Sequence, residues 1–213
     1  IIDCAIQTPS LPCFLKLRNT FNRSFSMHAP AHFGMSSIQN DSPDGWIIFG
    51  SHSNISDQLA WHQQLSHFIQ SQLEKNIPTL GICFGHQLIA HHFGAEISRI
   101  DNMYEIHQGK RLTKIINNFH GFKKGQNYSI FTSHKYEVSN LSKHLIHVGE
   151  SDLCKYDIVS HESLPYLGVQ GHPESSEYFI HKEVSKPINP KDLKDIIKGG
   201  DYFMEEIFKN FLV

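Results

Sequence analysis

The 213-residue sequence lacks several features that would point to particular classes of protein. It contains no apolar run that approaches the roughly 20 residues needed to span a bilayer. It also lacks a strong charge of either sign: the formal net charge is −2 with histidine neutral, so electrostatics favour neither nucleic acid nor an anionic membrane as a partner. The start of the chain lacks the basic segment and long apolar stretch of a secretory signal, and we therefore expect none.

Cysteine is sparse. Four cysteines in a chain of this length do not indicate a disulfide framework: Cys4, Cys13, Cys83 and Cys154. A reducing compartment suits such a chain, and we expect a cytoplasmic protein.

Metal-binding motifs are also missing, although the chain has 16 histidines. The pairs His28/His32 and His91/His92 have no Cys-x-x-Cys, His-Glu-x-x-His or carboxylate at ligand spacing beside them. We expect most histidines to be solvated or hydrogen-bonded side chains. Neither a metal nor another cofactor is predicted.

Apolar patterning predicts a single α/β domain over residues 1–213, without internal repeats or long linkers. Alternating strands and helices favour a mainly parallel central sheet with helices on both faces, and the middle of the chain adds an antiparallel part. One predicted helix, 57–75, has Ser56 or Asp57 as its expected N-cap. The other predicted helices are 14–21, 87–93 and an amphipathic one after Pro190. The predicted strands are 1–4, 24–28, 46–49, 79–83, 111–116, 128–132, 145–150, 156–160 and 164–170.

One short segment has the pattern of a nucleophile elbow, a sharp turn between a strand and a helix. Residues 81–87 read G-I-C-F-G-H-Q. Glycines two before and two after Cys83 fit such a turn, because side chains there would collide with the neighbouring strand and helix. The thiolate is the reactive form of cysteine, and a helix N-terminus favours negative charge. We therefore predict Cys83 as a nucleophile.

A second segment supplies the groups that would serve this nucleophile. Residues 168–174 read G-V-Q-G-H-P-E at the end of a predicted strand. Alternate residues of a strand share one face, so Glu174 would orient His172 and His172 would deprotonate Cys83. Alone, a buried cysteine is usually a core residue and a His-Pro-Glu sequence a surface turn. Their combination predicts a Cys-His-Glu catalytic triad.

Together the two segments resemble the class I glutamine amidotransferases, whose triad is Cys-His-Glu. The resemblance covers about residues 45–180 and points to free-standing members, similar to the glutaminase of GMP synthase or to γ-glutamyl peptidases. It implies a flavodoxin-like α/β fold with a mainly parallel central sheet and a smaller antiparallel sheet. It also implies that a γ-glutamyl amide, glutamine above all, is hydrolysed through a γ-glutamyl thioester.

Two backbone N–H groups are expected to form the oxyanion hole. One belongs to Phe84, directly after the nucleophile, and the other to the loop after strand 46–49, where Gly50 matches the family's donor position. By the same resemblance, Ser51 of this loop, Gln87 in G-x-C-x-G-x-Q, and the Ser-His-x-x-x-Val stretch are predicted to contact substrate. The predicted contacts in that stretch are Ser133, His134, Lys135 and Tyr136.

The sequence leaves the leaving group open. Many amidotransferase domains have phenylalanine before the catalytic histidine, whereas this chain has Gly171, as in γ-glutamyl peptidases, and we interpret this as open space beside the active site. A glutamine-hydrolysing enzyme is the first hypothesis. A peptidase acting on glutathione-type conjugates is the second, and a subunit that donates ammonia to a synthase partner, with little activity alone, is the third.

Overall fold

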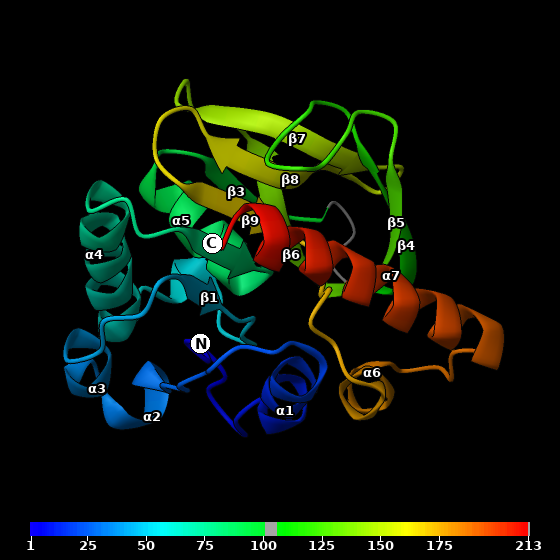
Figure 1. Ribbon diagram of the computed structural model, residues 1–213, viewed down its shortest axis with the longest axis horizontal. Coiled ribbons are helices and arrows are strands. Elements are labelled where there is room, and N and C mark those ends of the chain that lie inside the picture. Colours follow the sequence, from blue (N-terminus) through cyan, green and yellow to red (C-terminus); the bar gives the residue numbers. More distant parts are fainter. Residues whose placement is uncertain (101–105, 213) are drawn as a thin grey trace.

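A seven-stranded sheet forms the centre of the computed structural model, which describes residues 1–100 and 106–212 (Figure 1). The strand order is β1-β2-β9-β8-β7-β4-β5, and a separate two-stranded sheet pairs β3 with β6. The strands are β1 Trp46–Ile48, β2 Thr79–Ile82, β3 Glu96–Arg99, β4 His107–Ile115, β5 Asn127–His134, β6 Tyr136–Asn140, β7 Leu145–Ser151, β8 Cys154–His161 and β9 Tyr166–Val169.

The large sheet is mixed, and the expectation that it is mainly parallel is wrong. Strands β1, β2 and β9 pair in parallel with one another, whereas β8 pairs antiparallel with β9, and β7, β4 and β5 continue the sheet by antiparallel pairing. The connections explain the difference. A helix crosses between β1 and β2, as parallel pairing requires, but short turns join β7 to β8 and β8 to β9 and reverse the chain. The smaller antiparallel sheet is present as expected.

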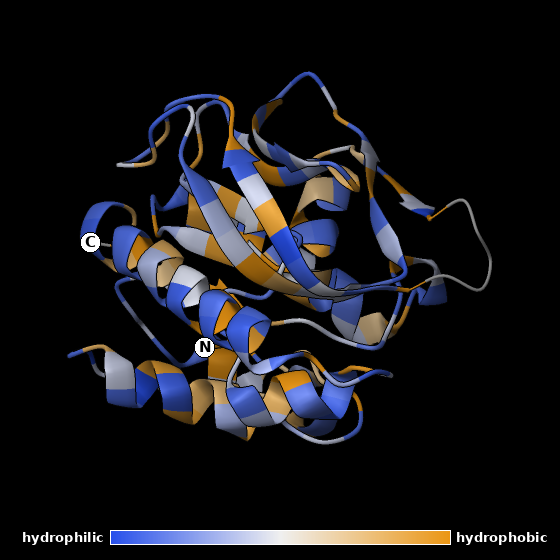
Figure 2. Cartoon of the chain, turned by 90° about the vertical axis from the view of Figure 1, so that its right-hand side faces the viewer, coloured by the Kyte–Doolittle hydropathy of each residue, from blue (hydrophilic) through white to orange (hydrophobic). Residues whose placement is uncertain are grey.

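Helices cover both faces of the sheet. On one face, Leu17 of α1 and Phe203 and Ile207 of α7 pack in a core with the strands. On the other face, Leu65 of α4 and Leu88 of α5 belong to a second core. Figure 1 shows α7 crossing the sheet on one side and α4 and α5 grouped together, and Figure 2 shows hydrophobic segments concentrated where strands and helices meet. The helices are α1 Leu11–Thr20, α2 Pro30–Phe33, α3 Ser36–Gln39, the 3-10 turn η1 Ile55–Asp57, α4 Ala60–Glu74, α5 Phe84–His92, α6 Glu177–Glu183 and α7 Pro190–Asn210.

Capping explains where the two long helices begin. Helix α7 starts at Pro190, and its N-cap Asn189 accepts a hydrogen bond from the amide of Asp192, as the proline and the amphipathic pattern predict. Helix α4 starts later than expected, at Ala60, so the predicted N-cap at Ser56 or Asp57 is wrong. Asn54 caps the 3-10 turn, and Gln58 then adopts a left-handed conformation with φ 48°, which separates that turn from the helix.

The N-terminal strands predicted at 1–4 and 24–28 are reduced to isolated bridges. Ile2 bridges both Ile48 and His28. The carboxylate of Asp3 then accepts hydrogen bonds from the amides of Ala5 and Ser10, which turns the chain away from the sheet. As a result, the segment 5–12 runs beside the carboxyl ends of β1 and β2 instead of extending the sheet.

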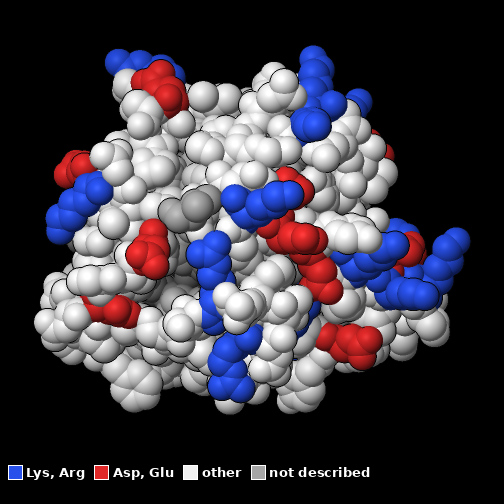
Figure 3. Space-filling view, viewed as in Figure 1, with Lys and Arg blue, Asp and Glu red and all other residues white. Residues whose placement is uncertain are grey.

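Surface charge agrees with the balanced composition. On the face drawn in Figure 3, basic and acidic side chains lie side by side. Across the part of the chain that the structure describes, no helix has the length and apolar character needed to cross a membrane.

Candidate active site

Cys83 lies at the sharp turn between β2 and α5. Its backbone has φ 51° and ψ −103°, a conformation that non-glycine residues rarely adopt and that often marks a functional site. The flanking glycines are needed for close packing. A Cβ atom on Gly85 would lie 2.5 Å from the carbonyl oxygen of Ile48, and one on Gly81 would lie 2.7 Å from the carbonyl carbon of Gly85. The strand–turn–helix expected from the motif is therefore present.

His172 and Glu174 lie beside this turn, both almost fully buried. The Nδ1 atom of His172 is 2.9 Å from Oε1 of Glu174, and the imidazole shares its cavity with Cys83. Burial lowers the pKa of His172, but Glu174 and Cys83 raise it by more, so that this pKa lies well above its usual value. The arrangement thus favours an imidazolium that faces the sulfur.

The backbone around this imidazole is anchored to the sheet. The amide of His172 donates to the carbonyl of Phe131 in β5 at 2.7 Å, and the hydroxyl of Ser175 donates to the carbonyl of His172 at 2.8 Å. The ring of Phe179 in α6 lies 5.3 Å from the imidazole, centroid to centroid. These contacts fix the backbone of His172 to β5 and place Phe179 beside its ring.

The two residues predicted to form an oxyanion hole both lie next to Cys83. Phe84 is the first residue of α5, so its amide has no helical carbonyl partner. Gly50 follows β1 and approaches the site so closely that a Cβ atom there would lie 2.9 Å from Cε1 of His172 and 3.5 Å from Cβ of Cys83. A side chain at position 50 would displace either the loop or the imidazole.

We expect Gly50→Val to lower kcat by about two orders of magnitude, because each preorganised oxyanion donor contributes roughly that factor. Gly50→Ala, with a smaller clash, should give an intermediate loss. The measurement is steady-state kinetics together with thermal unfolding. A Gly50→Val protein with wild-type kcat would show that this loop has no part in catalysis.

Of the residues predicted to contact substrate, Ser51 and Ser133 lie at the cavity that contains Cys83. The carbonyl oxygen of Ser133 is 4.0 Å from the sulfur of Cys83. Gln87 is buried rather than on a helix surface, and its Nε2 atom donates to the carbonyl of Tyr136 at 2.6 Å and to Oε1 of Gln170 at 3.1 Å.

The remaining residues of that stretch point elsewhere. His134 is buried, with Nε2 2.7 Å from the guanidinium of Arg111 and Nδ1 3.1 Å from the carbonyl of Tyr136. Lys135 is exposed, and Tyr136 is half-buried at the start of β6. Among the described residues, the cavity wall includes none of His134, Lys135 and Tyr136.

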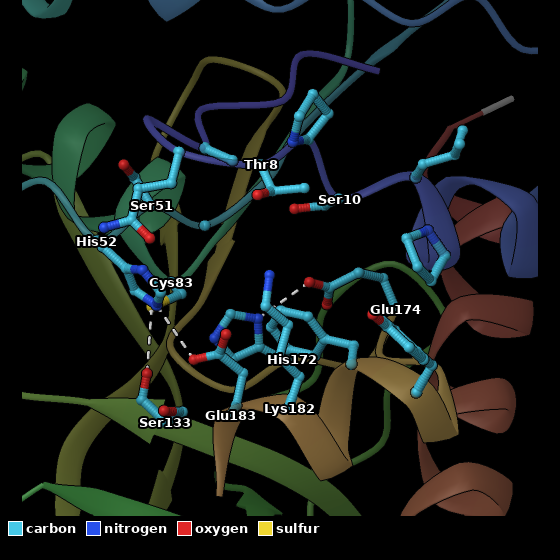
Figure 4. A pocket seen from close by; sticks show the side chains of 18 of the residues that line it. Thr8, Ser10, Ser51, His52, Cys83, Ser133, His172, Glu174, Lys182 and Glu183 are labelled. Carbon is cyan, nitrogen blue, oxygen red and sulfur yellow. Dashed lines mark hydrogen bonds and ion pairs between the residues drawn. The ribbon is translucent and has the colours of Figure 1, made fainter.

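The cavity has a volume of about 310 Å³, and most of its wall comes from segments without a recognised motif. Figure 4 shows His172 between Cys83 and Glu174, with Thr8 and Ser10 on one side and Lys182 and Glu183 of α6 on the other. The wall residues that the motifs do not identify are residues 5–12, His52, Tyr178, Phe179, Lys182 and Glu183. The only sequence signal for α6 is its position directly after residues 172–174.

An ion pair crosses the cavity. Nε2 of His52 lies 3.1 Å from Oε2 of Glu183, linking the loop after β1 to the end of α6. The hydrogen bond with Glu183 raises the pKa of His52, and the same bond lowers the pKa of Glu183. The loop that contains Gly50 is thereby connected to the helix that follows the His172 segment.

Gly171 does not open the site, and that interpretation is wrong. A Cβ atom on Gly171 would lie 2.7 Å from Cγ2 of Ile130 and 3.1 Å from the carbonyl oxygen of Phe131, both in β5. Gly171 is also not part of the cavity wall in the described chain. The glycine permits a close approach of the backbone to β5, so it no longer supports a bulky leaving group.

One group of potential metal ligands occurs within residues 1–100 and 106–212, formed by His107, His134 and Glu137. Nε2 of His134, however, lies 2.7 Å from Nη1 of Arg111, which is itself ion-paired with Asp157 at 2.7 Å. A guanidinium in contact with a ligand nitrogen opposes a bound cation, because Arg111 donates to the lone pair that a metal would need. The pairs His28/His32 and His91/His92 do not form such a group in the described residues.

Comparison with known proteins identifies the family to which the chain belongs. The sequence model of the family "Glutamine amidotransferase class-I" matches residues 18–184. The chain belongs to the class I glutamine amidotransferases. A glutamine-hydrolyzing GMP synthase subunit from Methanococcoides burtonii is 33% identical over 145 residues, 64% of this chain and 67% of that protein. Its counterpart from Thermococcus kodakarensis is 35% identical over 129 residues, 60% and 65% of the two chains. The chain therefore spans about two thirds of the length of these relatives.

Solved structures show that the class I amidotransferase fold extends over the whole chain. A glutamine amidotransferase from Thermotoga maritima superposes with a TM-score of 0.74 at 18% identity, covering 100% of this chain and 98% of that one. A glutamine amidotransferase from Methylobacillus flagellatus gives a TM-score of 0.68 at 16% identity, covering 92% and 86%. The fold expected from the two motifs is thus confirmed, with the mixed sheet described above.

Proposed function

We propose that this chain hydrolyses the γ-carboxamide of glutamine with Cys83, His172 and Glu174 as a catalytic triad. One observation carries the proposal: a cysteine in a strained, glycine-flanked turn shares its cavity with a buried imidazole that Glu174 holds at 2.9 Å. Membership of the class I glutamine amidotransferases supports it.

In the first half of the proposed reaction, the Cys83 thiolate attacks the amide carbon, and the amides of Phe84 and Gly50 stabilise the oxyanion. His172, as the imidazolium, protonates the leaving nitrogen, so that the C–N bond breaks and ammonia departs. Glu174 keeps the proton-bearing Nδ1 directed towards itself, which leaves Nε2 facing the sulfur. A γ-glutamyl thioester remains.

In the second half, neutral His172 removes a proton from water as the water attacks the thioester. The C–S bond breaks and the electron pair returns to sulfur. Glutamate leaves, and the imidazolium and thiolate are restored. The cycle needs no metal or other cofactor.

We further propose that the ammonia passes to an acceptor on a synthase partner. The support is that several relatives are named as subunits of a glutamine-hydrolyzing GMP synthase. For the alternative of a γ-glutamyl peptidase, Gly171 no longer offers support.

The deciding experiment is incubation of the pure chain with L-glutamine and, separately, with glutathione. We expect glutamate and ammonia in equal amounts from glutamine, and little glutamate from glutathione. Glutamate from glutathione alone would favour the peptidase. If neither substrate reacts, even after addition of a synthase partner of the kind that the relatives' names imply, the proposed function is wrong.

A further inference from the structure

A buried amide side chain outside the cavity wall contacts the proposed nucleophile. Gln170 directly follows β9, and its side chain is completely inaccessible to solvent. Its Nε2 atom lies 3.6 Å from the sulfur of Cys83. Gln170 is not among the residues that line the cavity in the described chain, so it reaches the sulfur from within the protein.

A second glutamine determines which end of this amide faces the sulfur. Nε2 of Gln87 lies 2.6 Å from the carbonyl oxygen of Tyr136. A carbonyl oxygen only accepts hydrogen bonds, so the nitrogen of Gln87 must face it. The second proton on that nitrogen points to Oε1 of Gln170 at 3.1 Å. With its oxygen engaged as an acceptor, Gln170 presents its NH2 group to Cys83.

Chain geometry explains why these residues meet. Gln87 lies one helical turn after Cys83, and Gln170 directly follows β9, which pairs with the strand β2 that leads into Cys83. The sulfur thus has an amide donor outside the cavity wall, and it shares the cavity itself with the imidazole of His172.

We infer that Gln170 is a catalytic residue that donates a hydrogen bond to the Cys83 thiolate, and that Gln87 is a positioning residue that sets the orientation of the Gln170 amide. The inference rests on the proposed function, since it takes Cys83 as the nucleophile. The donor acts twice in each turnover. It stabilises the thiolate before attack, and it stabilises the sulfur again when the thioester C–S bond breaks and the electron pair returns to it.

This assignment gives Gln87 a different role from the substrate contact that the sequence motif suggests. Both protons on its nitrogen are engaged by Tyr136 and Gln170. Replacing Gln87 should therefore alter the reactivity of the sulfur even when no substrate is present, and this separates the two roles.

The test is the pH dependence of iodoacetamide alkylation at Cys83, followed by peptide mass spectrometry without substrate. A hydrogen bond to a charged group contributes enough that its loss should move the pH midpoint of alkylation upward by about one unit in Gln170→Leu. Gln170→Glu keeps the size and the acceptor for Gln87 but places a carboxylate near the sulfur, so its shift should be larger. Gln87→Leu should shift the midpoint less than Gln170→Leu, and should add nothing in the double variant.

Other titrating groups near the sulfur belong to the same cluster in every variant. They are His172 beside it, Glu174 behind the imidazole, and His52 and Glu183, whose charges also reach His172. The pH midpoint of Cys83 alkylation reports the titration of this whole cluster. Because the other groups are the same in every variant, a difference in midpoint between variants measures the effect of the replaced glutamine. Gln64→Leu, on the exposed side of α4, is the control and should leave the midpoint unchanged.

Unchanged midpoints in both Gln170→Leu and Gln170→Glu, with folding confirmed by circular dichroism, would overturn the inference while leaving the proposed function intact. If Gln170→Leu does not fold, the isosteric Gln170→Glu decides alone. A wild-type Cys83 that reacts no faster than the three other cysteines would instead remove the nucleophile, and with it both proposals.

Discussion

Cys83→Ala is expected to abolish glutamine hydrolysis and leave the fold intact. Without the sulfur no thioester forms, and loss of a covalent nucleophile lowers kcat by several orders of magnitude. Cys83→Ser should be almost as inactive, because a hydroxyl is far less readily ionised than a thiol at this position. The measurement is ammonia and glutamate release under saturating glutamine, with thermal unfolding as the test of folding.

The matched control is Cys154→Ala, a cysteine that is also buried but lies in β8, outside the cavity wall. Its loss should reduce stability and leave kcat near the wild-type value. Near-normal turnover by Cys83→Ala would refute the proposed mechanism. Alkylation gives a second comparison, because burial raises the pKa of Cys4, Cys13 and Cys154 and should keep these three thiols unreactive.

His172→Ala should be as damaging as loss of the nucleophile, because the same imidazole protonates the leaving nitrogen and later activates water. Glu174→Gln should cost less, since the orienting acid of a triad generally contributes less than the residues it serves. The comparison is made in kcat/KM for glutamine. A Glu174→Gln enzyme that is slower than His172→Ala would reverse the assigned roles.

The pH dependence of kcat/KM is a second test of the roles of His172 and Glu174. Glu174 raises the pKa of His172, so replacing the carboxylate with a neutral amide should lower this pKa. The imidazolium would then lose its proton at lower pH. The basic limb of the kcat/KM profile should therefore move to lower pH in Glu174→Gln, and a movement in the opposite direction would contradict the assignment.

Local sequence patterns predicted the part of the fold around Cys83. The turn at Cys83 follows from glycines two residues to either side, and the buried strands β1 and β2 follow from continuous apolar runs. Strands β3 and β6 escaped prediction because they are short and half-exposed and pair only with each other, so neither has the apolar run that indicates a strand. The direction of β8 depends on short turns, which apolar patterning does not reveal.

The walls of the cavity could not be predicted for a different reason. They depend on contacts between segments that are distant in sequence. His52 meets Glu183 across 131 residues, and the segment 5–12 reaches the cavity only because Asp3 turns the chain there. Gln87 was singled out by its spacing from Cys83, but its engagement with Gln170 requires β9 to lie beside α5.

The most direct measurement of the central claim is covalent trapping with a glutamine analogue that carries a diazoketone in place of the carboxamide. Such a reagent binds as glutamine does and alkylates the nucleophile that attacks it. The account predicts one adduct per chain, located on Cys83 by peptide mass spectrometry, prevented by excess L-glutamine and absent from Cys83→Ala. An adduct on another residue, or glutamine hydrolysis that continues after Cys83 is fully modified, would contradict it.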